Sequence, residues 1–538
     1  MSSIDMNKQA VRLFLLAFAM VFPFAACHGP EPEPVPPPNP APTSITLSSS
    51  SFKVAQAGEE LSLTITAPSR PQITGLPAWI TYVDGTYSNY SIKVGLKVAA
   101  NEDYEARTAT LTVSSTGASS VQVSITQDAK EKPTPPPPGP EPKDNEAWKL
   151  AETLGLGWNM GNHFDAIYTW HYVDENGFDW YNYPSETAWG NTPATLATFK
   201  GVKAAGFTSV RIPVTWMKWI GPYPDFKIDE AWINRVYEVV GFAHEAGLNV
   251  IINTHHDENH GDDHWLDIKN AVDNSTLNDA IKAEIKAVWT QIANKFADCG
   301  DWLIMESFNE INDGGWGWSE EFRKDPSRQC NILNDWNQVF VDAVRSTGGN
   351  NETRWLAVPS YAANPEFTKY MKLPDDKSGK IIVAVHFYDP YDYTLGDAQY
   401  SDWGHTGAAG KKANGGDEDH VQEVFGKLCS DYVDKGIPCY LGEFGCSMRA
   451  KSDNRAWRFF LYYLEYVVKA ANTYGLPCFL WDNGATDTGK EQHGYINHAT
   501  GSYVGNSKEA IDVMKRAWFT KSDSYTLTSV YNSAPKIN

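Results

Sequence analysis

Short apolar runs alternate with longer amphipathic segments from about residue 145 to about residue 520, and this alternation limits the fold more than any other property of the 538-residue chain. The apolar runs have the length of buried strands and lie at 154–159, 209–214, 250–255, 303–309, 354–359, 381–387, 438–443 and 477–481. Segments with helical periodicity lie at 193–205, 230–246, 277–296, 333–346, 421–434 and 455–473. Eight alternating strand–helix units form a parallel sheet that closes on itself. We therefore predict an α/β chain with a (β/α)8 TIM barrel at 145–522 and a C-terminal tail at 523–538.

Two proline-rich segments divide the rest of the chain. Residues 28–43 contain eight prolines in sixteen positions, and residues 131–142 contain seven in twelve. Such segments are extended and semi-rigid, and they act as spacers between modules. We predict linkers at 27–43 and 129–144, and these isolate a small module at 44–128.

The small module is predicted to be an all-β, immunoglobulin-like sandwich. Polar and apolar residues alternate with period two in the runs 62–66, 91–98, 109–113 and 121–126, and turn residues separate the runs. The stretch Leu-Pro-Ala-Trp-Ile (76–80) and the pattern between Arg107 and Gln127 resemble the BACON domain of Bacteroidetes proteins. The resemblance implies carbohydrate binding, but Trp79 lies in an apolar run that is typical of a core. We favour a spacer, with sugar binding as the alternative.

The first residues have the pattern of a secretion signal. Basic residues precede an apolar run at 13–22 that is too short to span a bilayer, and small residues follow directly before Cys27. This order resembles a bacterial lipobox, although Phe24 stands where leucine is commoner. We predict a signal peptide at 1–26 and a lipid on Cys27 that anchors the protein in the cell envelope, at the outer membrane and facing the cell surface, with the periplasmic face as the alternative. An ordinary signal peptide cut near Cys27 is the alternative.

Composition limits the partners and cofactors. The chain has 66 acidic and 45 basic residues and a net charge of −21, which argues against nucleic acid, because Lys and Arg bind phosphates. The six cysteines that follow Cys27 contain no Cys-x-x-Cys pair of the kind that holds structural zinc. Their spacing does not select a disulfide pattern, and buried unpaired thiols are the alternative.

Polar and aromatic side chains gather where the predicted barrel strands end. They are Arg211, His255, His256, Asn309, Glu310, His386, Tyr388, Glu443 and Trp481. The carboxyl ends of barrel strands meet on one face, which is where barrel enzymes place their chemistry. Two carboxylates on this face, Glu310 and Glu443, fit glycoside hydrolysis, in which one protonates the leaving oxygen and the other attacks or activates water. A separation of about 5–5.5 Å would predict retention and about 6.5–9.5 Å inversion, and the spacing in the sequence leaves this open.

Several motifs together resemble glycoside hydrolase family 5. They are Gly-Trp-Asn-Met-Gly-Asn (157–162), Arg-Ile-Pro (211–213), Ser-Phe-Asn-Glu (307–310), His-Phe-Tyr (386–388) and Leu-Gly-Glu-Phe-Gly (441–445). The stretch Glu-Thr-Ala-Trp-Gly (186–190) is similar to the subfamily that contains endoglucanases and xyloglucanases. The resemblance implies a retaining mechanism, with Glu310 as acid/base and Glu443 as nucleophile.

The resemblance also implies supporting roles around these carboxylates. Asn309 would bind the 2-hydroxyl of the attacked sugar, and Arg211 and Tyr388 would support the nucleophile. His386 would lie beside the acid/base. His255 would hydrogen-bond sugar, and Trp481 would form the floor of the cleavage subsite. For this chemistry the pKa of Glu310 should be raised, whereas Glu443 must stay ionised.

Further sugar contacts are expected around the cleft. Asn162 and Asp165 match family positions near the outer subsites, and His256 is expected to contact sugar beside His255. Exposed rings can stack on sugar from glycine-rich or polar loops, and the tryptophans in such loops are Trp189, Trp316, Trp318 and Trp403. Tryptophans in helical patterns are expected in the core, and these are Trp232, Trp289, Trp336 and Trp457.

A histidine-rich segment at 255–264 offers a metal site as an alternative. His256, His260 and His264 are four residues apart, but they follow a strand and Gly261 interrupts the spacing. The HExxH signature is absent, because Asp257 follows His256. We expect sugar contact here and no catalytic metal.

These observations predict a retaining endo-β-1,4-glucanase that acts on plant β-glucan, with xyloglucan as the favoured substrate. Cellulose-like or mixed-linkage β-glucan and mannan are alternatives with the same mechanism. A non-catalytic carbohydrate-binding lipoprotein is the alternative from another class, and the presence of both carboxylates argues against it. We expect a monomer without a cofactor.

Overall fold

The computed structural model describes residues 40–101, 103, 105–131, 135, 139–167, 171–173, 176, 179–181, 185–258, 264–396 and 400–536. It separates into two compact units, an all-β unit that ends at Ala129 and a barrel unit that begins at Lys130. The predicted signal peptide at 1–26 and Cys27 lie outside the described residues, as does part of each linker, so these stay predictions. In the described part of the chain, every helix is too short or too polar to cross a lipid bilayer.

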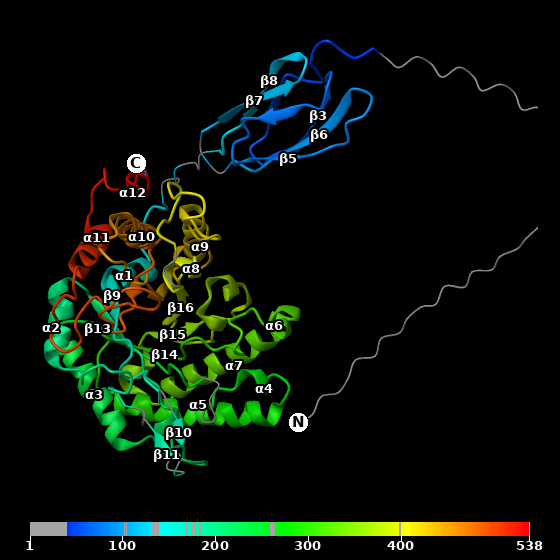
Figure 1. Ribbon diagram of the computed structural model, residues 1–538. Helices are drawn as coiled ribbons and strands as arrows, with labels where there is room; N and C mark the ends of the chain where they lie inside the picture. The colour runs from blue at the N-terminus through cyan, green and yellow to red at the C-terminus, as the bar shows by residue number, and fades with distance from the viewer. Residues whose placement is uncertain are drawn as a thin grey trace, which may run out of the picture. The chain divides into compact units, whose positions relative to one another are not determined.

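The all-β unit is a sandwich of two four-stranded sheets, as predicted (Figure 1). One sheet has the order β1-β3-β6-β5 and the other β2-β8-β7-β4. The strands are β1 (Thr46–Leu47), β2 (Ser51–Val54), β3 (Glu59–Thr66), β4 (Gln72–Thr74), β5 (Ile80–Val83), β6 (Ser91–Val98), β7 (Arg107–Ser115) and β8 (Ala118–Gln127). Apolar side chains alternate into the core between the sheets. Trp79 packs against this core, and the Arg107 guanidinium lies 4.5 Å from the centre of its ring.

The barrel unit contains eight parallel strands that close in the order β12-β13-β14-β15-β16-β17-β18-β9. They are β9 (Leu156–Asn159), β12 (Ser209–Ile212), β13 (Asn249–Ile252), β14 (Leu303–Glu306), β15 (Leu356–Pro359), β16 (Ile381–Phe387), β17 (Cys439–Phe444) and β18 (Cys478–Leu480). Nearly every strand residue is buried, because the barrel interior covers one face and the helices cover the other. A hairpin of β10 (His171–Val173) and β11 (Asp179–Tyr181) lies in the loop after β9. The predicted TIM barrel is thus confirmed.

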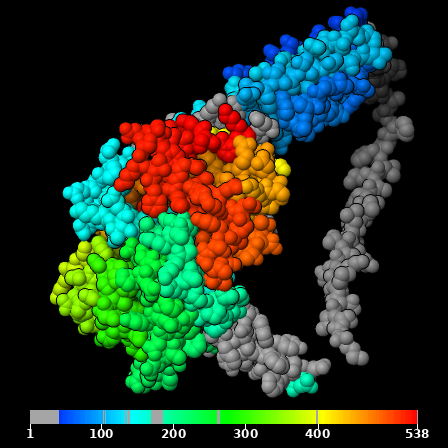
Figure 2. Space-filling view, turned by 90° about the vertical axis from the view of Figure 1, so that its left-hand side faces the viewer, coloured from blue at the N-terminus to red at the C-terminus, as the bar shows by residue number. Residues whose placement is uncertain are grey.

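Helices surround the barrel (Figure 1). They are α2 (Leu196–Ala205), α3 (Glu230–Glu245), α4 (Ile268–Ala271), α5 (Ser275–Lys295), α6 (Glu320–Lys324), α7 (Pro326–Arg345), α8 (Tyr391–Thr394), α9 (Glu418–Asp431), α10 (Asn454–Thr473), α11 (Ser507–Phe519) and α12 (Leu527–Asn532). Helix α7 begins seven residues before the predicted start, because a proline at its first position favours helix initiation. Lys515 of α11 packs against Gly206, at the end of α2, and Figure 2 shows this side, with α11 and α12 in red.

Helix α1 (Glu146–Leu154) closes the amino-terminal end of the barrel. Its residues Leu150 and Leu154 join the cluster of side chains inside the barrel, which includes Ile251, Ile304 and Phe479. The interior is therefore a packed core, and the opposite end, where the strands finish, is left to carry the polar groups.

Candidate active site

A fully buried arginine organises the carboxyl-terminal end of the barrel. Arg211, near the end of β12, donates from Nη1 to Glu443 at 2.8 Å and to Asn159 at 3.1 Å. Its Nη2 donates to Asn309 at 2.8 Å, and Nε and Nη2 together hold the carboxylate of Glu306 at 2.7–3.2 Å. Burial opposes a positive charge, but the two carboxylates outweigh it and raise the pKa of Arg211. The guanidinium is thus a fixed charge with every donor engaged.

Glu306 is a member of this network that the sequence analysis missed. It lies at the end of β14, is 1% exposed, and also accepts hydrogen bonds from Asn253 at 3.0 Å and from the Tyr440 hydroxyl. Burial favours the neutral acid, but the charge of Arg211 outweighs it and lowers the pKa of Glu306. A glutamate in an otherwise apolar strand was the available signal, because a buried charge requires a partner.

Glu443, in β17, has the contacts that the sequence predicted. Its Oε1 accepts from Arg211, and its Oε2 accepts from the Tyr388 hydroxyl at 3.0 Å. Burial and the neighbouring carboxylates raise the pKa of Tyr388 well above its usual value, so this hydroxyl stays protonated and donates a hydrogen bond to Glu443. Glu443 is therefore a nearly buried carboxylate with fixed donors on both oxygens.

His255 follows β13 and faces Glu443 as a neutral ring. Burial, His256 and Arg211 lower its pKa well below the usual value. Its Nδ1 lies 3.2 Å from the Asn253 amide nitrogen, a donor, so the ring proton is assigned to Nε2, 4.0 Å from Glu443 Oε1. The ring of Trp481 lies parallel to that of His255, with centres 6.0 Å apart. These rings form an aromatic wall beside the carboxylate.

Glu310 lies opposite Glu443. One carboxylate oxygen of Glu310 and one of Glu443 are within 4.8 Å of each other, and His386 belongs to the same group of atoms. Glu310 Oε1 is 2.6 Å from His386 Nδ1, and Oε2 accepts a 3.3 Å hydrogen bond from the Trp316 indole. The predicted place of His386 beside Glu310 is thus present.

The expectation of a raised pKa for Glu310 was wrong for this structure. Burial does favour the neutral acid, but the hydrogen bond and charge of His386 outweigh it and lower the pKa. Burial lowers the pKa of His386 in turn, yet the carboxylates of Glu443 and Glu310 outweigh burial and raise it. His386 thus favours the ionised form of Glu310, and the two carboxylates favour the protonated form of His386.

The expected sugar contacts differ in how far they are exposed to solvent. Trp316 and Trp318 are exposed in the loop after β14, at 51% and 75%. Trp189 is half-buried, with its ring 5.7 Å from that of His256, a histidine whose pKa burial lowers to about 4. A groove of about 410 Å³ adjoins Trp189 and is lined by Asn162, Trp189, Gly190, Asn191, Asn483, Gly484, Ala485, Lys490, Glu491 and Gln492.

Two of the expected contacts are not available to sugar. Trp403 is only 1% exposed, because its loop folds against α10 and its ring packs among Tyr462, Tyr463 and Tyr466. Asp165 is fully buried and accepts the backbone N–H groups of Asn162 and His163, so it shapes the loop that carries Asn162. The four helical tryptophans are buried, as predicted.

Within the described residues, two sets of three side chains lie close enough to share a metal ion. One is Asp165, His255 and His256, and the other is Glu310, His386 and Glu443. The histidine-rich loop of the metal alternative lies partly outside the described residues, at 259–263. The six cysteines after Cys27 are buried and unpaired.

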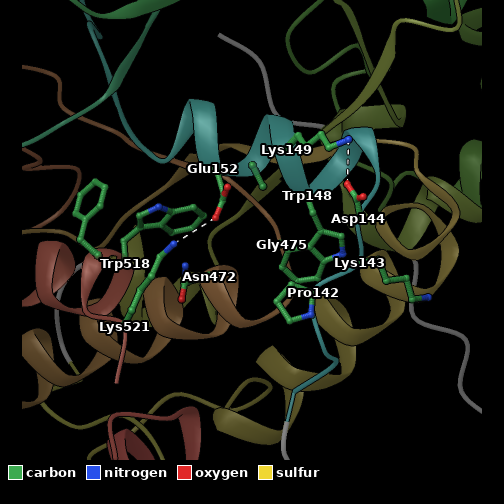
Figure 3. Close-up of a pocket in the computed structure, with 12 residues that line it drawn as sticks. Pro142, Lys143, Asp144, Trp148, Lys149, Glu152, Asn472, Gly475, Trp518 and Lys521 are labelled. Atoms are coloured by element: carbon green, nitrogen blue, oxygen red, sulfur yellow. Dashed lines mark hydrogen bonds and ion pairs between the residues drawn. The ribbon is translucent and has the colours of Figure 1, made fainter. Parts of the chain in front are cut away.

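A larger cavity, of about 810 Å³, lies at the α1 end of the barrel, away from the carboxylates. Figure 3 shows Trp148 and Trp518 among its walls, with the ion pairs Lys149–Asp144 and Lys521–Glu152. Both ion pairs are largely exposed to solvent. This cavity offers no group that is placed for catalysis.

A closed (β/α)8 barrel with two facing carboxylates at its carboxyl-terminal end is the site of a glycoside hydrolase. The model of the cellulase family, glycosyl hydrolase family 5, matches residues 173–487, and the BACON model matches 72–128. The chain belongs to glycosyl hydrolase family 5 and carries a BACON domain.

Solved structures and a curated relative agree with this family. A GH5-4 broad specificity endoglucanase from Bacteroides salanitronis is 51% identical, with a TM-score of 0.65, over 70% of this chain and 97% of that one. A Bacteroidetes-affiliated GH5 cellulase linked with a polysaccharide utilization locus is 42% identical, with a TM-score of 0.68, over 74% and 99%. The xyloglucan-specific endo-beta-1,4-glucanase of Bacteroides ovatus is 31% identical over 451 residues, 80% of this chain and 84% of that protein.

Proposed function

We propose that this enzyme is a retaining endo-β-1,4-glucanase that cleaves plant β-glucan, with xyloglucan as its favoured substrate. The observation that carries the proposal is that one carboxylate oxygen of Glu310 and one of Glu443 lie within 4.8 Å of each other. Retaining enzymes have carboxyl groups about 5–5.5 Å apart, because the second carboxylate itself attacks, whereas inverting enzymes leave room for a water molecule. The fixed donors on Glu443 also argue against the alternative of a non-catalytic binding protein.

Glu443 is the nucleophile in this mechanism. Arg211 and Tyr388 donate to its two oxygens and aim a free lone pair at the anomeric carbon, and the C–O bond to the leaving sugar breaks as the bond to Glu443 forms. The Asn309 oxygen is engaged by Arg211, which leaves its NH2 group for the 2-hydroxyl of the attacked sugar. Trp481 is the floor below this sugar.

Glu310 gives a proton to the leaving oxygen and later takes one from the attacking water. His386 Nδ1 lies 2.6 Å from Glu310 Oε1 and occupies this oxygen, which leaves Oε2 to carry the acid proton toward the glycosidic oxygen. In the second step Glu310, again a carboxylate, activates water that releases the sugar from Glu443. Glu310 therefore serves as acid and base in turn, and His386 fixes its orientation through Oε1.

Internal cleavage fits the surroundings of the carboxylates. The groove near Trp189 is lined by the loops after β9 and β18, and the exposed ring of Trp316, in the loop after β14, contacts Glu310. A chain can thus extend past the cleaved bond in both directions. Relatives described as a broad specificity endoglucanase and as a xyloglucan-specific enzyme support a β-1,4-glucan backbone as the substrate.

One experiment tests the activity and its stereochemistry together. Purified protein is incubated with xyloglucan, barley β-glucan, carboxymethylcellulose and glucomannan, and new reducing ends are measured. NMR spectra recorded in the first minutes should show the β-anomer, because two inversions restore the configuration. Initial α-anomer would contradict the assignment of Glu443 as nucleophile, and no product from any polysaccharide would favour the binding-protein alternative. A higher rate on glucomannan than on xyloglucan would overturn the substrate preference alone.

A further inference from the structure

The loop at 312–319 holds a tryptophan against the carboxylate of Glu310. The Trp316 indole N–H lies 3.3 Å from Glu310 Oε2, and half of this side chain is exposed to solvent. His386 occupies the other oxygen, Oε1. Oε2 is therefore the oxygen that must meet the glycosidic oxygen, and Trp316 lies directly beside it.

This contact is built into the loop. The Asn312 amide donates to the Glu310 carbonyl at 2.7 Å, and its oxygen accepts from the backbone N–H groups of Gly314 at 2.7 Å and Trp316 at 3.3 Å. Trp316 has φ +48°, a conformation that side-chain-bearing residues rarely adopt and that persists only where surrounding contacts enforce it. One buried side chain, Asn312, thus ties the strained backbone of Trp316 to the backbone of Glu310.

Glycine at 317 fixes the other side of the loop. Gly317 has φ +84°, and a Cβ there would lie 2.4 Å from the ring of Phe367. The loop therefore packs closely on the barrel unit below and turns the Trp316 ring outward, beside the catalytic carboxylate.

We propose that Trp316 is the platform for the sugar on the leaving-group side and that its indole N–H couples occupancy of that side to proton transfer by Glu310. The proposal rests on the function proposed above, and it favours substrates whose chain continues past the cleaved bond. Trp481 is parallel to His255, which faces the nucleophile Glu443, whereas Trp316 is hydrogen-bonded to the acid/base Glu310, so Trp316 is assigned to the departing sugar. A pyranose stacks its C–H face on an indole, and its hydroxyls can exchange hydrogen bonds with the N–H that now engages Oε2.

Two substrates separate this role from general damage to the site. Cellohexaose places sugars on both sides of the cleaved bond and needs an acid. The substrate 2,4-dinitrophenyl β-cellotrioside has an acidic phenol as leaving group, so it needs neither the platform nor the acid in the step that kcat/KM reports. Trp316→Ala removes ring and N–H, and we expect kcat/KM to fall about 10- to 100-fold on cellohexaose and to stay within about twofold on the aryl substrate.

Trp316→Phe keeps a ring and removes the N–H. Its KM for cellohexaose should stay within about twofold of wild type, while the basic limb of the kcat/KM profile moves to higher pH. That limb reports loss of the acid proton, and the indole hydrogen bond helps to lower the pKa of Glu310. Trp318→Ala alters a ring on the same loop for which no hydrogen bond to Glu310 is seen, and it should leave the limb in place. Phe519 is an exposed aromatic residue in α11, and Phe519→Ala should leave kcat/KM unchanged on both substrates.

The outcomes are distinct. Equal losses on both substrates for Trp316→Ala, or no loss on cellohexaose, would overturn the platform. An unmoved basic limb in Trp316→Phe would overturn the coupling. A wild-type protein that cleaves neither substrate would instead refute the proposed function. Because Trp316 is half exposed, both variants should fold, which thermal unfolding of each purified protein checks.

Discussion

The two ends of the barrel carry ion pairs of similar length in opposite environments. At the carboxyl-terminal end, Arg211 lies 2.7–2.8 Å from Glu306 and Glu443, and all three are at most 8% exposed. At the α1 end, Lys521 lies 3.3 Å from Glu152, and these side chains are 85% and 76% exposed. Water screens the second pair, whereas the first is held in a region of low dielectric constant.

This difference separates a catalytic site from an ordinary surface. The larger cavity, at the α1 end, holds exposed ion pairs that water can replace. At the carboxyl-terminal end the charged groups are buried, so neighbouring protein groups stabilise them in place of water. Burial, hydrogen bonds and the neighbouring charges shift the pKa values of Glu306, Glu310 and His386. Desolvated charge, and not cavity size, therefore marks the chemistry.

The largest effect is expected from Glu443→Gln. The amide keeps the shape but cannot attack the anomeric carbon, so kcat on xyloglucan should fall by about 10⁴-fold or more. The matched change at the other end, Glu152→Gln, should leave kcat unchanged within error. Reducing-sugar assays on both purified variants measure this. Near-wild-type turnover of Glu443→Gln would show that the buried end is not the site.

The next largest effect is expected from Glu306→Gln. Glu306 contacts Arg211, Asn253 and Tyr440 and is not placed to touch the reacting atoms. Arg211 stays paired with Glu443, but the buried hydrogen bonds that the Glu306 carboxylate accepts from Arg211 and Tyr440 lose their charge, and a hydrogen bond to a charged group contributes about 1.5–3 kcal/mol. Glu152→Gln should cost less than about 1 kcal/mol, because exposed pairs contribute little. Urea unfolding of both variants gives the two free energies.

A positioning role for Glu306 has a second consequence. Glu306 holds the Arg211 guanidinium through Nε and Nη2, so without it Arg211 and Glu443 lose their exact placement; kcat on xyloglucan should fall about 10-fold or more while KM changes little. Glu306→Asp, which keeps the charge, should restore part of both properties. Equal costs for Glu306→Gln and Glu152→Gln would remove the distinction between the two ends.

The sequence was sufficient for the barrel, because strands buried on both faces form apolar runs that helical patterns separate. It was also sufficient to find Glu310 and Glu443, since polar residues at strand ends must share one face. It could not place Trp403, because a loop sequence does not show whether its loop folds back on α10. Nor could it give the direction of the pKa shift of Glu310, which depends on one contact with His386, a residue 76 positions away.

The smallest effect concerns pH and a buried carboxyl beside the site. Asp257 is fully buried, and burial raises its pKa to about 7 although it accepts hydrogen bonds from Trp265 and Trp216. Its usual pKa when unfolded is about 3.9. Between these values the native protein binds more protons than the unfolded chain, so the contribution of Asp257 to stability is full below about pH 4 and is lost as pH rises through about 7.

Comparison with Asp257→Asn isolates this contribution, because all other groups titrate alike in both proteins. The free energy of unfolding of the wild type minus that of Asp257→Asn should be larger at pH 5 than at pH 8, by at least about 1 kcal/mol. The same difference for Glu152→Gln should not vary with pH over this interval, since the exposed pair of Glu152 with Lys521 contributes little to stability. A difference for Asp257→Asn that is constant, or that grows with pH, would mean that water reaches this carboxyl and that desolvation does not extend beneath the catalytic end of the barrel.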